Sequence, residues 1–475
     1  MNLIDYIIFA GYLLGVFAVG AYFYKKNKSN EDYFVGGREM SPTHVGLSVV
    51  ATDVGGGFSI GLGGLGYLMG LSGSWLLFTG LVGAWLSAVL IIPRIKKLDM
   101  EEGFLTFPDF LRYKFNGKVA LLAAIISGIG YIGFTGGQIL AGAKLASGTM
   151  FEEAVLGMDP NTISILVIAG IILIYTVMGG LKAVIYTDTV QWLILIGGLL
   201  FFAIPFTVSG LGGFEKIYES LPREFFSLTN VSLIQVVNWA ITIIPIWVVA
   251  MTLYQRIYAC KTVKDAKKAW YIAGIFEYPI MSFIGVFLGM CSRIYFPDID
   301  AETGLPLLLK EVLPIGIKGI VIAAYFSAIM STADSCLIAS SGNIVNDILH
   351  RYLFKNVSDK KLIRLSQIST LFVGIVAVLI AFMFESVLGV ILHAYSFMVG
   401  GLVVPTLFAY FSKKPNSTAA IRSIITGGVT TLLINLFEID MPLGLNAAFY
   451  GIAISLITYL ITNLITTNKM EIHVR

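Results

Sequence analysis

The chain has 475 residues, of which 57% are hydrophobic and 13% are charged, and its mean hydropathy is +0.84. This composition lies far outside that of a soluble globular domain and predicts an integral, multi-pass membrane protein. The formal net charge of +3, without a long stretch of like charges, argues against nucleic-acid binding, and three widely spaced cysteines form no disulfide or metal-binding pattern.

Apolar stretches long enough to cross a bilayer run along the whole sequence, since a hydrocarbon core of about 30 Å needs roughly 20 apolar residues per helix. Thirteen such helices are expected, near residues 3–24, 42–70, 73–93, 119–147, 162–180, 184–209, 231–255, 270–296, 313–346, 364–384, 386–411, 418–437 and 445–467. The first follows Met1 without a basic flank or a cleavage pattern, which favours a transmembrane helix over a removed signal peptide. The connections are too short for an independent core, so residues 1–475 are expected to form one all-α transmembrane domain.

Basic residues lie unevenly between the two sets of connections. With the N-terminus outside, most of the 32 lysines and arginines fall in the inner connections, and the outer connections hold only Lys216, Arg223, Arg293, Lys310 and Lys318. Basic loops resist translocation, so this bias predicts an outer N-terminus, an inner C-terminus and an odd number of spans, in a plasma membrane.

Two of the expected helices contain helix-breaking residues. Residues 51–57, in the second span, read Ala-Thr-Asp-Val-Gly-Gly-Gly, and Pro245 lies in the middle of the seventh span. Helices interrupted at corresponding positions are typical of inverted-repeat transporters, which would make residues 42–209 and 231–411 the two repeats. The alternative is that Pro245 only kinks its helix and that the glycines only permit close packing.

Four carboxylates lie within or at the edge of the expected spans: Asp53, Asp188, Glu277 and Asp334. A carboxylate in a membrane is costly unless an ion, a partner or a water-filled cavity compensates it. Each is therefore a candidate functional residue.

Hydroxyl groups surround one of these carboxylates in the ninth span. Helical spacing places Ala328, Ser331, Thr332 and Ser335 along one face, and Asp334 borders that face. Oxygen ligands on a rigid helix opposite a broken one suit a hard cation such as Na⁺. The alternative is that the hydroxyls bond the carbonyls four residues earlier while Asp334 faces a wet crevice.

Several motifs carry a family resemblance. Residues 179–191 read GGLKAVIYTDTVQ, residues 32–38 read DYFVGGR, and Gln255-Arg256 is followed by Lys261 and Ala266. Over residues 1 to about 411 the chain resembles the sodium:solute symporter family. The resemblance implies a five-plus-five inverted-repeat fold of the leucine-transporter type, with two broken helices, a leading helix at 3–24 and two trailing helices at 418–467.

The resemblance also implies two ion sites. The residues that match the family's common sodium site are Ala51, Val54, Ala328, Ser331 and Thr332. Some members have a further sodium site, and the residues that match it are Asp188, Ser331 and Ser335. This chain has Asp334 where those members carry a hydroxyl, and the extra carboxylate would tighten a second Na⁺ or replace it with a proton. The hydroxyls of Ser331 and Ser335 favour the second Na⁺.

A substrate pocket is expected between the two broken helices. Its candidate residues are Asp53, Phe58, Ser59, Gln138, Trp239, Trp247 and Tyr395. Each aromatic side chain can equally face lipid or pack in the bundle. Trp247 is the strongest candidate among them because it follows Pro245 by two residues and matches a tryptophan of some sugar-carrying relatives, and Asp53 matches an aspartate of some relatives.

These expectations predict a secondary transporter that couples Na⁺ entry to uptake of a small organic solute by alternating access. Its partners are then the solute and the lipid bilayer, and no protein partner is implied. A proton-coupled symporter of the same fold is the alternative. An embedded enzyme needs a nucleophile with a base or a metal cluster, and a channel favours a continuous polar pore. The solute stays open among amino acids, carboxylates, sugars and quaternary amines.

Overall fold

The computed structural model describes residues 1–26, 30–151, 153–154, 157–178, 181–354 and 357–473. Within these ranges the chain is helical, and the β-type pairing found there is a single bridge between Met40 and Cys260. The expected all-helical class is confirmed.

The helices are connected by short segments. In chain order the α-helices are α1 (Leu3–Lys26), α2 (Asn30–Val35), α3 (Pro42–Asp53), α4 (Gly55–Met69), α5 (Trp75–Leu90), α6 (Ile92–Glu102), α7 (Phe107–Lys114), α8 (Gly117–Thr149), α9 (Pro160–Met178), α10 (Leu181–Gly198), α11 (Ile204–Gly210), α12 (Phe214–Ser220), α13 (Leu233–Val249), α14 (Met251–Ala259), α15 (Val263–Ile275), α16 (Phe283–Tyr295), α17 (Ala301–Val312), α18 (Ile317–Gly342), α19 (Asp359–Met383), α20 (Val387–Phe411), α21 (Ser417–Leu436) and α22 (Ala447–His473). The 3₁₀ segments are η1 (Gly36–Arg38), η2 (Gly70–Ser74), η4 (Arg223–Phe226) and η7 (Pro442–Gly444), and the π-helical segments are η3 (Leu199–Ala203), η5 (Phe276–Ser282) and η6 (Asn343–Leu353).

Nine helices of the described chain are long and apolar enough to cross a membrane, or ten if the bent pair α13 and α14 forms one span. The total is lower than thirteen because α4, η2 and α5 run together over Gly55–Leu90 and because two apolar helices, Leu3–Val19 and Pro160–Ile174, are shorter. Many apolar helices confirm an integral multi-pass membrane protein. Thirteen spans and the inverted repeat remain predictions.

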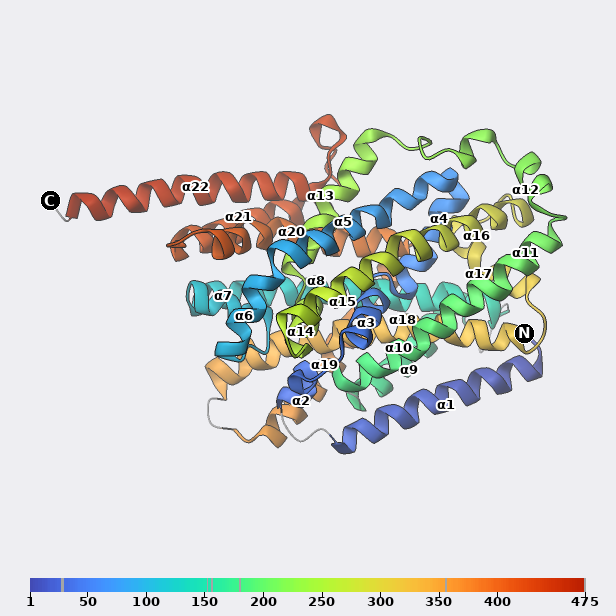
Figure 1. Ribbon diagram of the computed structural model, residues 1–475, viewed down its shortest axis with the longest axis horizontal. Coiled ribbons are helices and arrows are strands. Elements are labelled where there is room, and N and C mark those ends of the chain that lie inside the picture. Colours follow the sequence, from blue (N-terminus) through green and yellow to red (C-terminus); the bar gives the residue numbers. More distant parts are fainter. Residues whose placement is uncertain (27–29, 152, 155–156, 179–180, 355–356, 474–475) are drawn as a thin grey trace.

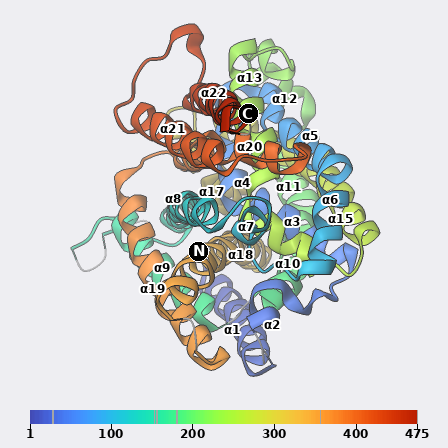
Figure 2. The same ribbon diagram turned by 90° about the vertical axis from the view of Figure 1, so that its left-hand side faces the viewer.

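Helix α18 forms the centre of the bundle. It is buried along almost its whole length, and α3, α4, α8 and α10 pack around it (Figure 2). The exposed faces of α19, α21 and α22 carry Leu, Ile, Val and Phe side chains at the periphery. A hydroxyl-rich helix therefore lies where packing, not lipid, surrounds it.

The first interruption is shorter than expected. Helix α3 ends at Asp53 and α4 begins at Gly55, so residues 51–57 do not unwind as a segment. The amide of Val54 donates to Val50 O at 2.9 Å and the amide of Phe58 donates to Val54 O at 3.1 Å, which keeps helical bonding on both sides. The helical conformation is interrupted at Gly55, whose φ of +45° is one that residues with a side chain rarely adopt.

The glycines at this break let α18 come close. A Cβ atom at Gly55 would lie 2.1 Å from Oγ1 of Thr332, and one at Gly56 would lie 1.8 Å from Cγ1 of Ile329. A side chain at either position would push α18 away from α3 and α4. The triple glycine therefore has both of the roles considered from the sequence: it interrupts the helix, and it permits close packing.

The second interruption lies later than expected. Helix α13 continues through Pro245 to Val249, and the 44° bend between α13 and α14 falls at Ala250, whose backbone is extended. The prediction of a break at Pro245 is wrong in position. Proline removes one backbone donor, but the helix resumes, because the amide of Ala250 still donates to Ile246 O at 2.9 Å.

The two described ends of the chain lie at opposite ends of the bundle (Figure 1). Close to the N-terminal end of the bundle, Lys144 Nζ pairs with Glu302 at 2.9 Å and with Asp300 at 2.6 Å. Glu302 also accepts hydrogen bonds from the amides of Val387 (2.8 Å) and Leu388 (3.0 Å) at the start of α20. These contacts tie α8, α17 and α20 together at this end.

Candidate functional site

Three residues of the predicted first sodium site meet across the break in α3 and α4. The hydroxyl of Thr332, on α18, lies 3.0 Å from the carbonyl oxygen of Ala51 and 3.1 Å from that of Ala328. One hydroxyl and two carbonyl oxygens thus form a compact oxygen group, and the absence of a side chain at Gly55 leaves room for it. Oxygen is the ligand that hard cations prefer.

The other two predicted ligands are engaged differently. The carbonyl of Val54 accepts the amide of Phe58, and the hydroxyl of Ser331 donates to Oδ1 of Asp188. Each oxygen keeps a lone pair, because a carbonyl or a hydroxyl has two. The structure therefore brings Ala51, Ala328 and Thr332 together and directs Ser331 toward the signature aspartate.

Asp188, on α10, is held in a buried ion pair. Its Oδ2 lies 3.3 Å from a guanidinium nitrogen of Arg256, on α14, and both side chains are fully buried. The hydroxyl of Ser48 also donates to Asp188. The guanidinium donates further to Ser335 Oγ at 2.9 Å, Ser48 Oγ at 3.0 Å and Thr52 Oγ1 at 2.5 Å. A fixed cation of the protein thus neutralises Asp188.

The partner of Asp188 was not identified from the sequence. Gln255-Arg256 stood out as a family motif, but no site role followed from it. Its signal was an arginine at the end of an interrupted span, where a charge needs compensation. The motif at 179–191 contains Asp188, and its first two residues, Gly179 and Gly180, lie outside the described residues.

Asp334 faces a different helix. Its Oδ1 accepts the hydroxyl of Thr176, on α9, and its buried Oδ2 has no hydrogen-bond partner within the described chain. No hydrogen bond joins Asp334 to Asp188 there, and the Ser335 hydroxyl belongs to the Arg256 group. Of the four residues of the predicted second site, Asp188, Ser331 and Ser335 therefore lie in the group around Arg256. Asp334 instead contacts Thr176.

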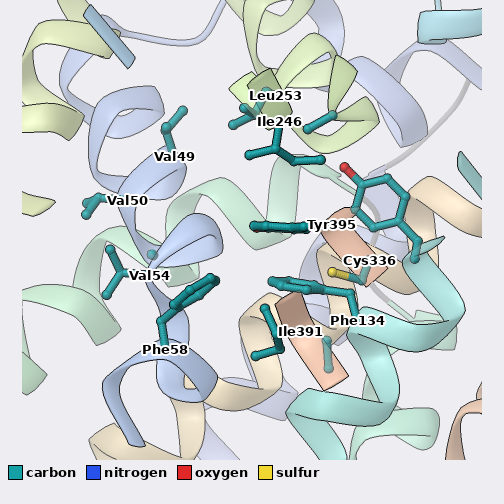
Figure 3. Packing of buried hydrophobic residues seen from close by; sticks show 14 of the residues in the cluster. Val49, Val50, Val54, Phe58, Phe134, Ile246, Leu253, Cys336, Ile391 and Tyr395 are labelled. Carbon is teal, nitrogen blue, oxygen red and sulfur yellow. The ribbon is translucent and has the colours of Figure 1, made fainter. Parts of the chain in front are cut away.

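An aromatic cluster lies beside the first break. The rings of Phe134 and Tyr395 stack with centroids 5.0 Å apart, and Phe58 lies 5.9 Å from Tyr395 (Figure 3). The Tyr395 hydroxyl donates to Oδ1 of Asp53 at 3.2 Å. Of the predicted substrate residues, Asp53, Phe58 and Tyr395 are thus brought together by α3, α4 and α20, and Phe134, on α8, is an addition that the sequence did not single out.

The remaining predicted substrate residues have other surroundings. Gln138 Oε1 accepts the amide of Gly57 at 3.0 Å, and the Ser59 hydroxyl donates to Gly55 O at 2.6 Å, so both support the break. Trp247 packs edge-on against Trp270, and its indole N–H has no hydrogen-bond partner within the described chain. Trp239 is buried on α13.

The sequence marked Glu277 as a candidate functional residue but assigned it to no site. It lies in η5, is fully buried, and its carboxyl group interacts with that of Asp53. The Tyr395 hydroxyl donates a hydrogen bond to Asp53, and no lysine or arginine of the described chain acts on either carboxyl group. The two residues lie far apart in the sequence, so local pattern held no signal of their pairing.

Comparisons with known proteins place the chain among sodium-coupled transporters by similarity. A model of the sodium:solute symporter family matches residues 33–427. The high-affinity proline transporter PutP of Bacillus subtilis is 29% identical, over 87% of this chain and 89% of its own. The sodium/glucose cotransporter of Vibrio parahaemolyticus is 28% identical, over 98% and 91%. A substrate-bound, outward-open Na⁺-coupled sialic acid symporter shares the fold, with a TM-score of 0.79, 24% identity and 98% of both chains covered.

Proposed function

Because the chain belongs to the sodium:solute symporter family, whose members compared above are transporters and not enzymes, we propose that it takes up a small organic solute with Na⁺ by alternating access. The family and the compared relatives support Na⁺-coupled transport of a solute. The mechanism, the ion site and the class of solute are the proposal.

The observation that carries the proposal is the oxygen group at Thr332. Its hydroxyl and the carbonyls of Ala51 and Ala328 converge where α3 gives way to α4. We assign the Na⁺ to this group, with Val54 and Ser331 completing the shell after small rotations. An ion there would connect the broken helix to α18, so its binding and release would be coupled to movement of the break.

Alternating access is supported by the two interruptions. The break at Val54 and the bend at Ala250 lie near the beginning of residues 42–209 and 231–411, the two proposed repeats. The leading helix at 3–24 and the trailing helices at 418–467 lie outside them. The opposite positions of the chain ends and the distribution of basic residues support an outer N-terminus and an inner C-terminus in a plasma membrane (Figure 1).

We propose one Na⁺ per transport cycle. The predicted second site consists of Asp188, Ser331, Asp334 and Ser335. Arg256 pairs with Asp188, so the guanidinium group already supplies a positive charge at this site. A second Na⁺ would have to enter beside the guanidinium. The proton-coupled alternative is supported by one observation: Oδ2 of Asp334 has no hydrogen-bond partner among the described residues, and a protonated carboxyl group can carry a proton through the cycle.

The solute pocket is proposed beside Asp53, Phe58 and Tyr395. This group lies next to the proposed ion site in the sequence and in the fold, so the solute and the ion would share the same moving helix. Gln138, Ser59, Trp239 and Trp247 would line or support its walls.

Uptake of labelled solutes into sealed proteoliposomes tests the proposal. We expect accumulation of at least one solute when an inward Na⁺ gradient is applied, and none when K⁺ replaces Na⁺ at equal membrane potential. Accumulation driven by an inward proton gradient without Na⁺ would favour the proton-coupled alternative. Equilibration of the solute without accumulation under either gradient would reject coupled transport.

A further inference from the structure

A pair of acidic side chains is buried inside the proposed carrier. Asp53 ends α3, and Glu277 lies in η5, between α15 and α16. Both side chains are buried, and their carboxyl groups interact with each other. Tyr395 donates one hydrogen bond to Asp53, whereas both oxygens of Glu277 lack a donor within the described chain.

The local structure leaves space for the Glu277 carboxyl group. A Cβ atom at Gly80, on α5, would lie 1.8 Å from Oε1 of Glu277, so only glycine permits this position. The helix around Glu277 is π-helical and contains Pro279, which cannot donate a backbone hydrogen bond. Such widened turns occur frequently at functional sites.

Among the described residues, no lysine or arginine pairs with Asp53 or Glu277. Two carboxylates side by side in a medium of low dielectric constant do not both stay ionised unless a cation neutralises them. Asp188, by comparison, has Arg256 within 3.3 Å. Either one of the two carboxyl groups therefore keeps a proton, or a bound cation balances their charge.

The surroundings indicate the chemistry of that cation. Oε1 and Oε2 of Glu277 have no hydrogen-bond donor within the described chain, and a quaternary ammonium group would not supply one. The rings of Phe58, Phe134 and Tyr395 next to Asp53 offer aromatic faces, which attract organic cations. An N–H-bearing ammonium group satisfies both requirements.

We propose that Asp53 and Glu277 together bind a protonated primary or secondary amine of the transported solute. The inference rests on the proposed function and names the class of solute. Simple carboxylates and quaternary amines then leave the Glu277 oxygens without donors, and sugars supply hydroxyl donors but no positive charge.

The same pairing gives a physical reason for coupling. Asp53 lies between Ala51 and Val54, whose carbonyls belong to the proposed Na⁺ site. With both carboxyl groups ionised, one Na⁺ and one ammonium group make this region neutral, whereas either alone leaves a net charge. Each ligand therefore favours binding of the other, and the full complex is the neutral one that crosses between states.

The experiment uses the purified full chain and matched probes. Four amines are each paired with an oxygen analogue: L-proline with tetrahydro-2-furoate, L-alanine with lactate, ethanolamine with ethylene glycol, and putrescine with butanediol. N,N-dimethylproline tests the quaternary case. Thermal stability is measured with and without Na⁺, and uptake is measured in proteoliposomes. We expect at least one amine to bind in Na⁺ about tenfold or more tightly than its analogue, because a hydrogen bond to a charged group is lost.

Variants locate the effect. Glu277→Gln should weaken the amine about tenfold or more and leave stabilisation by Na⁺ alone in place, and Glu277→Asp should recover part of the loss. Glu215→Gln, at an exposed position of α12, is the matched control and should change neither. Stability of each variant without ligands shows whether it has folded.

The outcomes separate the two proposals. Na⁺-driven uptake of a sugar or an oxygen analogue without any amine overturns the amine site and leaves coupled transport standing. Stabilisation by Na⁺ with no response to any of the four amines also overturns the amine site. Unchanged amine affinity in a folded Glu277→Gln variant also overturns the amine site. This holds even if the pH dependence of amine binding shifts in the variant. Absence of both Na⁺ stabilisation and Na⁺-driven uptake overturns the proposed function itself.

Discussion

Two buried acidic regions of this protein differ in what neutralises them. Asp188 is surrounded by a guanidinium group and the hydroxyls of Ser48 and Ser331, all supplied by the chain. Asp53 faces a second carboxyl group, that of Glu277, and receives one hydrogen bond from Tyr395. The first region is complete without a ligand, and the second is not. A carboxylate inside a membrane therefore indicates a binding site only when the protein itself leaves its charge unbalanced.

The comparison also separates structural from functional roles. Arg256 joins α14 to α3, α10 and α18 through Thr52, Asp188 and Ser335, so its bonds hold together the helices around both interruptions. The Asp53 region instead lies beside the Thr332 oxygen group and the aromatic cluster. We expect substitutions in the first region to affect folding, and substitutions in the second to affect ligand binding.

The largest expected effect is that of Arg256→Gln. It leaves Asp188 charged, buried and unpaired, which costs about 3–5 kcal/mol. The melting temperature of the purified protein in detergent should fall strongly, and the double variant Arg256→Gln with Asp188→Asn should recover most of the loss. Arg223→Gln, at an exposed position, is the control. A double variant no more stable than the single one would show that the ion pair is not the cause.

Thr332→Ala tests the proposed ion group. It removes a ligand that lies 3.0 Å from Ala51 O, so the Na⁺ concentration for half-maximal uptake should rise about tenfold or more, the usual effect of losing a bond to a charged partner. Ser331→Ala should change it less, because the Ser331 hydroxyl points to Asp188. Equal effects of the two variants would assign both hydroxyls to the ion, and unchanged Na⁺ dependence in both would remove the site.

Glu277→Gln tests the unbalanced pair without any ligand. Removing one of two adjacent carboxyl groups relieves their repulsion, so the protein should keep its stability or gain up to about 1 kcal/mol in Na⁺-free, solute-free buffer. This is the opposite of Asp188→Asn, which deprives Arg256 of its partner. Melting curves of both variants in the same buffer measure the difference. Strong destabilisation by Glu277→Gln would mean that the chain already neutralises the pair.

Asp334→Asn should have the smallest effect. Its side chain accepts one hydrogen bond from Thr176, which an amide oxygen also accepts, so stability should change by less than about 1 kcal/mol. Na⁺-driven uptake should keep its pH dependence and a coupling ratio of one, measured from the reversal potential of solute flux at several Na⁺ gradients. A ratio of two in the unsubstituted protein would restore the second Na⁺ site. Loss of pH dependence in the variant would favour proton coupling through Asp334.

Part of the candidate site followed from local sequence. The glycines at 55–57 predicted an interruption, and the spacing of Ala328 and Thr332 predicted that they share one face of α18. Helix breaking and helical spacing depend only on residues that are neighbours in the sequence. The motif at 179–191 identified the family, which the family model confirms. The bend at Ala250 escaped prediction because proline marks a missing donor, but the packing around α14 decides where the chain turns.

The sequence by itself determined an all-helical, multi-pass membrane protein with an oxygen-lined break, since apolar length, helix-breaking residues and helical periodicity are local properties. Only the tertiary structure decided which charges meet. Arg256 pairs with Asp188 and Glu277 with Asp53 because α14 and η5 pack against helices far away in the sequence. Four intramembrane carboxylates look alike in the sequence, and the energy of each depends on the partner that the folded bundle provides.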